Sequence, residues 1–529
     1  MRSVTSLLLA TVVSIFPVLA RASDCPKRPE PGSNVVDPYA IVSQNGVLQA
    51  SMTLARSVDT FGYTHYCYKY QLPHGIAEAP TLRVNPGDEL QLHLTNEIKP
   101  GDMGNSFRME MTHPQAQCGD GGAMTISSTN VHFHGMNVPP ICHQDDVIDT
   151  LIQPGTSGFD YKVEIPSDQP PGLYWYHPHV HGFTEFQVNG GAAGAIIVEG
   201  MDKVRPEVAG LKERVLIIRQ QYLVPWIPGP YQLTLNYQVD DFPKAALPVI
   251  KMKPGEKQFW RVANATLQDF IPLQVWIDGN PEPLELVAMD GYPLPQTRNI
   301  DTVFIPPAGR AEFIVQAPPT GSSGQVYIDS YDTGPTGNPD LATTLARIDI
   351  TQKQGADGVG QEELIKHEPS SGNGRPSRFK VADLRSLKPT AHRKLYFSEQ
   401  FGGTNGPIQF YITVDGQKQK VFDPNEKPVI TTKVGAVEDW TIENRALETH
   451  AFHMHQIHFM LLEVDGKPVD NPVMLDTVAI PYWDGHSPYH SVKVRMDFSD
   501  PTTAGTFLFH CHVLLHEDLG MMHKILVEP

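Results

Sequence analysis

Asn85–Asn96 reads NPGDELQLHLTN, and its pattern returns twice along the chain, as KPGEKQFWRVAN (253–264) and KVGAVEDWTIEN (433–444). In each copy a glycine precedes an asparagine by nine residues, and polar and apolar residues alternate between them. This arrangement predicts a turn that leads into a half-buried strand. Because the three copies are almost evenly spaced, we predict one β-rich domain that occurs three times.

A second repeat follows the first. PGLYWYHPHV (171–180) aligns without a gap with AGTFLFHCHV (504–513), and SGQVYIDSYD (323–332) stands at this place in the middle copy. The 529 residues include 47 prolines and 43 glycines, and no long amphipathic helix is evident, so we expect short strands broken by turns. We predict an all-β fold of three consecutive antiparallel sandwiches, at 30–200, 201–352 and 380–529, with a polar linker at 353–379.

The N-terminus and the composition bear on the compartment and the partners. Residues 1–22 contain a basic start, an apolar run (7–20) too short to span a bilayer, and an A-x-A cleavage site at 20–22. We expect a signal peptide at 1–22 and a periplasmic or extracellular protein; a membrane anchor is the alternative. The net charge of −18 argues against nucleic acid or an anionic membrane as a partner. We expect no membrane span and a monomer.

The chain has five cysteines, so an exported protein that pairs them leaves one over. Cys511 is the odd one, because histidines flank it on both sides. The other four, Cys25, Cys67, Cys118 and Cys142, allow three pairings, and the sequence does not choose among them. We favour Cys25–Cys67 with Cys118–Cys142.

Ten of the 22 histidines fall in four clusters that follow the repeat. They are His132, His134, His177, His179, His450, His453, His455, His510, His512 and His516. The pair 177/179 aligns with 510/512, and the pair 132/134 matches 453/455. In the middle copy Phe270, Leu273 and Val275 take the places of 450, 453 and 455, and Asp329–Tyr331 replaces His-Cys-His. The middle domain therefore keeps the fold and lacks the metal-binding side chains.

The H-x-H spacing predicts how these side chains point. Side chains alternate faces along a strand, so both imidazoles of an H-x-H pair lie on one face. If the outer domains face each other, eight imidazoles converge on one pocket, which suits copper, zinc or iron. Cys511 must point to the opposite face, where His450, His516 and, at longer range, Met521 can meet it. Two histidines, a thiolate and a weak axial thioether are typical of a blue-copper electron-transfer site.

With these four motifs in this order, the chain resembles a three-domain multicopper oxidase of the laccase-like group over essentially its whole mature length. The resemblance implies three cupredoxin-like Greek-key sandwiches and four copper ions. It implies that His450, Cys511, His516 and Met521 hold a type 1 copper, and that His132 and His453 hold a type 2 copper. The type 3 pair then takes His134, His177, His179, His455, His510 and His512.

Three acids are candidates for proton delivery, since reduction of O2 to water consumes four protons. The family often has an acid near the position of Asp145, and the adjacent Asp146 leaves the choice open; either side chain could instead anchor a loop. Glu517 follows His516 directly and matches a glutamate that spore-coat laccases use in proton delivery; a purely solvated role is the alternative. Asp476 resembles a family aspartate that we expect to support the ligands.

The reductant is the least determined feature. We expect phenols or aromatic amines, which donate electrons at the edge of His516 or His450, with O2 as the electron acceptor. The alternative is a metallo-oxidase that acts on Cu(I) or Fe(II), for which the methionines at 103, 109 and 111 are weak support. A non-catalytic relative that kept the fold for binding is a third reading, but such proteins tend to lose ligands and this chain has lost none.

Overall fold

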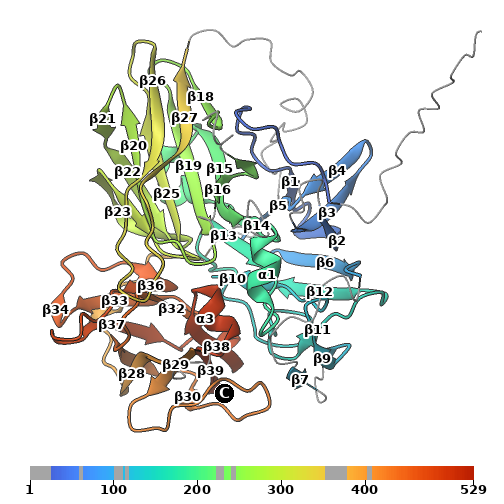
Figure 1. Cartoon of the computed structure of the whole chain (residues 1–529), viewed down its shortest axis with the longest axis vertical. Helices are drawn as coiled ribbons and strands as arrows, with labels where there is room; N and C mark the ends of the chain where they lie inside the picture. The colour runs from blue at the N-terminus through green and yellow to red at the C-terminus, as the bar shows by residue number, and fades with distance from the viewer. Residues whose placement is uncertain are drawn as a thin grey trace, which may run out of the picture.

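The computed structural model describes residues 25–58, 64–99, 111–113, 118–221, 232–239, 246–351, 378–401 and 408–529. The predicted signal peptide and most of the predicted linker lie outside these ranges. Three β-sandwiches follow one another along the chain, and Figure 1 shows them in blue to teal, green to yellow and orange to red. We call them the first, middle and third sandwiches. The prediction of an all-β fold with three consecutive sandwiches is confirmed, but the sheets are mixed rather than purely antiparallel, because each sandwich contains parallel strand pairs.

The first sandwich pairs two five-stranded sheets and adds two small ribbons. One sheet has the order β1 (Ala40–Val42), β5 (Thr81–Val84), β14 (Gly194–Val198), β13 (Gly172–His177) and β10 (His132–His134). The other has the order β12 (Phe159–Glu164), β6 (Glu89–Asn96), β2 (Val47–Val58), β3 (Thr64–Leu72) and β4 (Gly75–Glu78). The ribbons are β11 (Thr150–Leu151) with β8 (Cys118–Gly119), and β7 (Met111–His113) with β9 (Gly122–Met124).

The middle sandwich pairs a seven-stranded sheet with a six-stranded one. The seven-stranded sheet has the order β17 (Gln238–Val239), β16 (Gln232–Leu235), β15 (Lys212–Gln221), β19 (Lys257–Ala265), β25 (Arg310–Gln316), β22 (Leu284–Met289) and β23 (Tyr292–Ile300). The facing sheet runs β18 (Val249–Met252), β27 (Thr343–Ile350), β26 (Ser322–Ile328), β20 (Ile271–Ile277) and β21 (Asn280–Glu282), with β24 (Val303–Ile305) on β20.

The third sandwich repeats this plan. One sheet runs β29 (Gln409–Val414), β28 (Ala391–Gln400), β31 (Val437–Asn444), β37 (His490–Asp497), β33 (Phe459–Val464) and β34 (Lys467–Pro468), with β35 (Met474–Leu475) on β33. The other runs β30 (Ile430–Lys433), β39 (Met522–Glu528), β38 (Gly505–Cys511), β32 (His450–Met454) and β36 (Thr477–Ile480). The described α-helices are short: α1 (Thr184–Asn189), α2 (Met201–Val204) and α3 (Leu514–Asp518). In the part of the chain covered here, none of them has the length and hydropathy needed to cross a bilayer.

The repeated glycine and asparagine have the same structural task in all three sandwiches. Gly87, Gly255 and Gly435 all have φ between 73° and 89°, the left-handed region that favours glycine in a tight turn. Each repeat asparagine lies at or next to the end of its strand and caps the following loop, accepting a backbone N–H two residues on at 2.9–3.1 Å. Its amide also donates to two backbone carbonyls, which in the third sandwich belong to Glu448 and Ile480. The repeat therefore fixes the loop that leads into His450.

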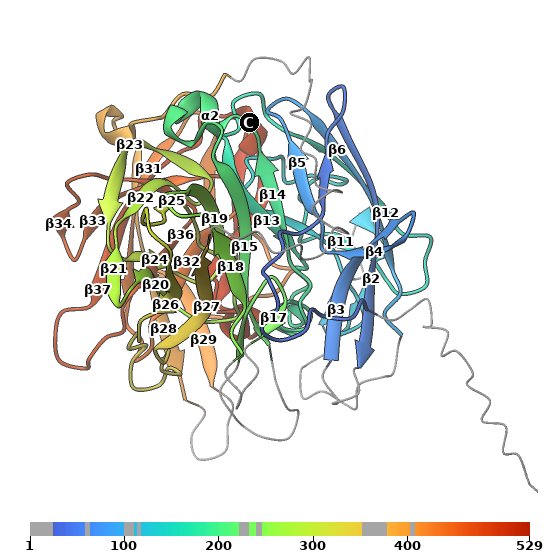
Figure 2. The same ribbon diagram turned by 90° about the horizontal axis from the view of Figure 1, so that it is seen from above.

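Strand burial alternates throughout as predicted in one of the three copies, and β31 alternates only over its second half. In β6 buried and half-buried residues alternate over all eight positions, whereas β19 is buried on both faces along nearly its whole length. The second face of β19 is covered because Ala263 and Ala265 pack on Leu173 and Trp175 of the first sandwich. Figure 2, seen from above, shows β13 beside β15 and β19. Each sandwich also has its own apolar core between its sheets.

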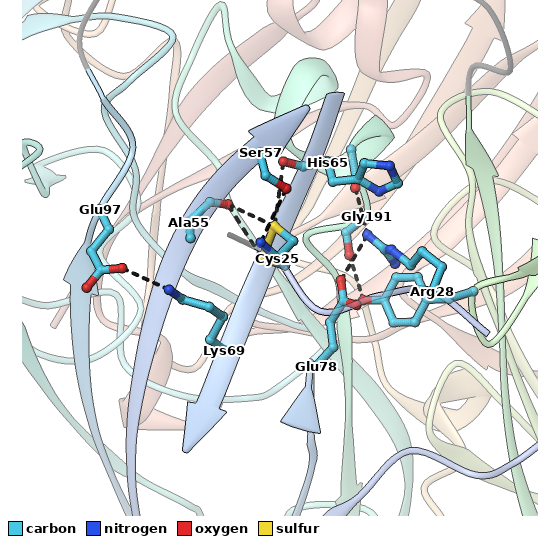
Figure 3. Close-up of a disulfide and its surroundings, with 12 residues drawn as sticks. Cys25, Arg28, Ala55, Ser57, His65, Lys69, Glu78, Glu97 and Gly191 are labelled. Atoms are coloured by element: carbon cyan, nitrogen blue, oxygen red, sulfur yellow. Dashed lines mark hydrogen bonds and ion pairs between the residues drawn. A yellow bond between two sulfur atoms is a disulfide. The ribbon is translucent and has the colours of Figure 1, made fainter. Parts of the chain in front are cut away.

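Two disulfides lie in the first sandwich, and both match the favoured pairing. Cys25 is bonded to Cys67 and Cys118 to Cys142, while Cys511 is free and buried. Figure 3 shows Cys25 beside the β2 residues Ala55 and Ser57, where its N–H donates to the Ser57 hydroxyl at 3.2 Å. The first of these bonds therefore ties the segment ahead of β1 to the sheet of β2 and β3.

Candidate metal centres

The histidine pairs sit directly across from each other in matching strand pairs. In the first sandwich His132 of β10 lies opposite His177 of β13, and in the third His453 of β32 lies opposite His510 of β38. The two strand pairs are therefore equivalent in register as well as in sequence. All ten clustered histidines are buried, with at most 2% of any of them exposed.

The outer sandwiches bring eight imidazoles together, as the sequence predicts. His134 stacks on His453 and His132 on His455, each with ring centroids 4.0 Å apart, and each pair joins the first sandwich to the third. On one side of the cluster, Nε2 of His510 lies 3.1 Å from Nε2 of His455 and 3.4 Å from Nε2 of His179. On the other side, the His512 ring lies 5.1 and 5.6 Å from the rings of 134 and 177.

The free ring nitrogens test whether this pocket fits a metal. Burial holds the pKa of His132, His134 and most of the other rings well below the usual value, so the imidazoles are neutral and can donate lone pairs. Among the described residues, several buried ring nitrogens have no hydrogen-bond partner: Nε2 of His132, His177 and His453, Nδ1 of His134 and His455, and both nitrogens of His512. Buried polar atoms are normally paired. The donor set therefore fits copper, which imidazole suits.

Cys511 forms a second cluster on the opposite face of β38. Its Sγ lies 3.4 Å from Nδ1 of His450 and 3.8 Å from Nδ1 of His516, and these two nitrogens are 3.2 Å apart. Burial alone would raise the pKa of the Cys511 thiol, but the two rings outweigh it and lower the pKa to about 6. The neighbouring side chains thus favour the thiolate, the form that binds metal.

Met521 rather than Met522 shares the core of the third sandwich with Cys511. The Cys511 N–H donates to the Met521 carbonyl at 3.1 Å, and both side chains are fully buried in the core of the third sandwich. Met522 belongs instead to a separate apolar cluster with Val147 and Leu508. The choice of 521 for the axial position is therefore supported by the packing of both methionines.

Comparison with known proteins gives the family. Family models described as "Multicopper oxidase" match residues 123–203, 216–352 and 401–529. The chain belongs to the multicopper oxidases. It is 23% identical to "Multicopper oxidase mco" of Staphylococcus aureus, over 94% of this chain and 90% of that one, and 22% identical to "Laccase" of Bacillus subtilis, over 85% and 89%. "Multicopper oxidase from Campylobacter jejuni: a metallo-oxidase" has a similar fold, with a TM-score of 0.65 at 21% identity over 95% of this chain and 96% of that one.

In this multicopper oxidase, His450 and His516 each face a carboxylate with the ring nitrogen turned away from Cys511. Neither carboxylate was predicted from the sequence. Nε2 of His516 lies 3.5 Å from Glu448, and Nε2 of His450 lies 3.5 Å from Glu399. Only Glu448 reaches solvent appreciably, with 15% of its side chain exposed. Glu448 stands two residues before a histidine motif and could have been noticed, whereas nothing in the sequence marks Glu399.

Of the two adjacent acids in the first sandwich, only Asp145 contacts the histidine pocket. Its Oδ2 lies 3.0 Å from Nδ1 of His132, and its carboxylate accepts the Phe133 N–H at 2.8 Å and the amide of Gln456 at 2.5 Å. Burial raises its pKa well above the ordinary value. Asp146 accepts the Asp149 N–H in the loop at 3.0 Å, and burial raises its pKa to about 6.

Glu517 of α3 is fully buried rather than solvated. Its two carboxyl oxygens lie 3.5 Å from Nε2 of His179 and 3.3 Å from Nδ1 of His510. Burial, with the charge of Asp518, raises its pKa well above the ordinary value. The multicopper oxidase thus places a buried carboxyl, whose protonated form is favoured by burial, between one histidine of each outer sandwich. This excludes the solvated alternative for this residue.

Proposed function

We propose that the chain is a copper-dependent oxidase that couples one-electron oxidation of a small reductant to four-electron reduction of O2 to water. The observation that carries this proposal is that the end of β38 and the residue after it join two donor clusters, with Cys511 on one side and His510 and His512 on the other. A donor strand of this kind suits a protein that moves electrons from one site to the other through a few covalent bonds.

We propose four copper ions per chain. Type 1 copper would be held by His450, Cys511 and His516 with Met521 as the axial group, and type 2 copper by His132 and His453. The six remaining histidines would form two sets of three for the type 3 pair. The first set, His179, His455 and His510, already converges within 4.8 Å, and the second is His134, His177 and His512. When bound, copper would supply the one-electron redox steps and the site at which O2 is reduced.

The protein's own residues would prepare and supply these sites. His450 and His516 hold Cys511 as a thiolate, and Asp145 orients the His132 ring through its Nδ1. Glu517 is proposed as the proton donor, because its carboxyl lies within 3.5 Å of His179 and 3.3 Å of His510 and burial raises its pKa. Asp145 is proposed to assist, and the loop position of Asp146 favours it less.

For the reductant we propose phenols or aromatic amines at the edge of His516. Phe410 stacks on that ring with centroids 4.0 Å apart, and the partly exposed Glu448 can accept a hydrogen bond from a hydroxyl or amine. Cu(I) or Fe(II) remains a second candidate, because two carboxylates face the two histidines of this cluster. Relatives include both laccases and proteins named as a metallo-oxidase or as "Iron transport multicopper oxidase FET3".

We keep the proposed domain bounds of 30–200, 201–352 and 380–529, since each sheet pair falls inside one of these ranges. We also keep the proposal that the chain is exported and acts as a monomer in the periplasm or outside the cell. Two disulfides support export, because such bonds form in oxidising compartments.

Metal analysis and O2 uptake test the proposed function together. Copper-reconstituted protein should contain four coppers per chain and a strong blue band, and it should consume O2 with a phenol panel. Two or fewer coppers without the band would overturn the ligand assignment. Comparison of Glu448→Gln with wild type then separates the reductants. The protein would be a metallo-oxidase if the wild type oxidised Fe(II) and Cu(I) faster than every phenol and if Glu448→Gln slowed the oxidation of these two ions alone.

A further inference from the structure

The middle sandwich places a buried arginine behind the histidine pocket. Arg310, at the start of β25, is fully buried and uses all five of its N–H donors. Nε donates to the Leu173 carbonyl of the first sandwich at 3.3 Å, and Nη1 and Nη2 donate to the Ala308 and Asp290 carbonyls of its own sandwich at 3.2 and 2.8 Å. The same two nitrogens donate to the Asp476 carboxylate of the third sandwich at 2.8 and 2.5 Å. Arg310 thus joins all three sandwiches.

Asp476, the partner of Arg310, holds two rings of the pocket from behind. Its carbonyl lies 2.9 Å from Nδ1 of His453, and its Oδ1 lies 3.4 Å from Nε2 of His134. The nitrogens on the far sides of these rings, Nε2 of His453 and Nδ1 of His134, are those that have no partner. Asp476 therefore contacts one proposed ligand from each outer sandwich, each at the nitrogen turned away from the metal position.

The space around this ion pair is closed. Gly135, which follows His134, has φ +81°, and a Cβ atom there would collide with both Arg310 and the Asp476 carboxylate. Asp476 is itself fully buried, and a buried carboxylate needs a counter-charge and hydrogen bonds. Arg310 supplies both in a fork geometry that a lysine cannot reproduce.

We propose that Arg310 is a positioning residue for His453 and His134, acting through Asp476, and that the ligand-free middle sandwich shapes the copper site by this route. The proposal rests on the ligand assignment given above. Partners behind a metal-binding histidine fix the orientation of its ring, and their loss typically lowers metal affinity about 10–100-fold.

Arg261 offers a matched control in the same sandwich. It is a second buried arginine, on the neighbouring strand β19, and it pairs with Glu312, whose carboxylate accepts the Leu173 N–H at 2.8 Å. The two arginines therefore support the same stretch of β13, but Arg261 has no contact with Asp476 among the interactions of the described residues.

The experiment compares Arg310→Lys, Asp476→Asn and Arg261→Lys in the full copper-reconstituted chain. The readouts are copper content, the electron paramagnetic resonance (EPR) spectrum of type 2 copper and the thermal unfolding midpoint. We expect Arg310→Lys and Asp476→Asn to keep the blue band, to lower type 2 copper affinity about 10–100-fold and to change the type 2 spectrum in the same way. Arg261→Lys should lower the midpoint and leave the type 2 spectrum unchanged.

Three outcomes would overturn the proposal or its basis. A wild-type type 2 spectrum and occupancy in Arg310→Lys, with a midpoint lowered as in Arg261→Lys, would make Arg310 a purely structural residue. If Arg310→Lys does not fold, an unchanged type 2 spectrum in Asp476→Asn overturns the proposal instead. Absence of a type 2 signal in the wild-type chain would refute the ligand assignment itself, which distinguishes the two failures.

Discussion

The middle and third sandwiches have a similar strand order but differ in the side chains at the end that faces the histidine pocket in the third. Where the third sandwich places His453 on β32, the middle one places Leu273 on β20, packed in its apolar core. A leucine there contributes burial of apolar surface, whereas a buried imidazole with an unpaired nitrogen costs free energy until a metal binds. The comparison teaches that the fold does not depend on the ligands, and that function was placed on two of three equivalent frameworks.

Strand register refines this comparison beyond the sequence alignment. His453 lies opposite His510, while Leu273 lies opposite Ile328. By register Ile328 therefore stands in the place of His510, whereas the ungapped alignment matched Asp329 to it. The pairing of β26 with β20 is regular over this stretch, so the one-residue offset reflects where the strands are paired and not a bulge in β26.

The largest effect we expect comes from removing Cys511, a proposed metal donor of the third sandwich that has no counterpart in the middle one. Cys511→Ser should abolish the blue band and reduce oxidase activity to background, because the thiolate is the proposed entry point for electrons. The absorption spectrum and O2 uptake check this. Ser330→Ala changes the residue that the ungapped alignment matches to Cys511 in the middle sandwich, and it should leave the blue band and O2 uptake unchanged. Appreciable O2 uptake by the serine variant would contradict the assigned electron route.

The carboxyls beside the pocket give the next effect. Glu517→Gln keeps the shape of the side chain but cannot release a proton, so turnover should fall about 10²–10⁴-fold, as is typical for loss of a general acid. Copper content and anaerobic reduction of the blue band should stay normal. Asp145→Asn should also lower turnover, and Asp146→Asn serves as the neighbouring control. Wild-type turnover in Glu517→Gln across the pH range would assign proton delivery to another group.

A smaller effect is expected at the axial position. A thioether donates weakly to the oxidised metal, so Met521→Leu should raise the type 1 potential while the blue band persists. Redox titration of the band measures the change. Met522→Leu is the matched control, since its side chain packs in a different cluster. A shift in the Met522 variant and none in the Met521 variant would reverse the assignment.

The smallest effect concerns a carboxyl pair in the middle sandwich. Burial and the charge of Asp269 raise the pKa of the half-buried Asp340, so the folded chain holds a proton that the unfolded chain loses above about pH 3.9. The free energy of unfolding therefore falls as pH rises. Asp340→Asn should stabilise the protein by about 1 kcal/mol at pH 8 and less at pH 5. Thermal unfolding midpoints check this against the exposed Asp301→Asn, and a larger gain at pH 5 would contradict the sign.

Much of this architecture follows from local sequence patterns. The glycine and asparagine of each repeat specify a turn and a loop cap, and H-x-H on a strand dictates that two rings share a face. These are short-range rules, so the sequence predicted the sandwiches and the residues of both donor clusters. The sequence allows three pairings of the four cysteines, and the structure has the favoured one.

Local sequence patterns do not predict contacts between residues that are far apart in the chain. Arg310 and Asp476 are far apart in the chain, and nothing near either residue indicates that they form a bidentate pair. Glu399 lies at the end of an ordinary strand, and its position behind His450 depends on how β28 packs. Glu517 was expected next to the metal clusters, but its complete burial depends on the docking of α3 against the first sandwich, where Asp518 accepts the Thr184 and Glu185 N–H groups of α1.

The docking of α1 on α3 has a consequence for the order of biosynthesis. The histidines of the first sandwich are made early and those of the third last, with the whole middle sandwich between them. The pocket is therefore incomplete until the final strands of the chain have been synthesised and folded against the first sandwich. Copper loading at this pocket then reports that the entire chain has reached its native arrangement, and a nascent or truncated chain presents only half of the donors.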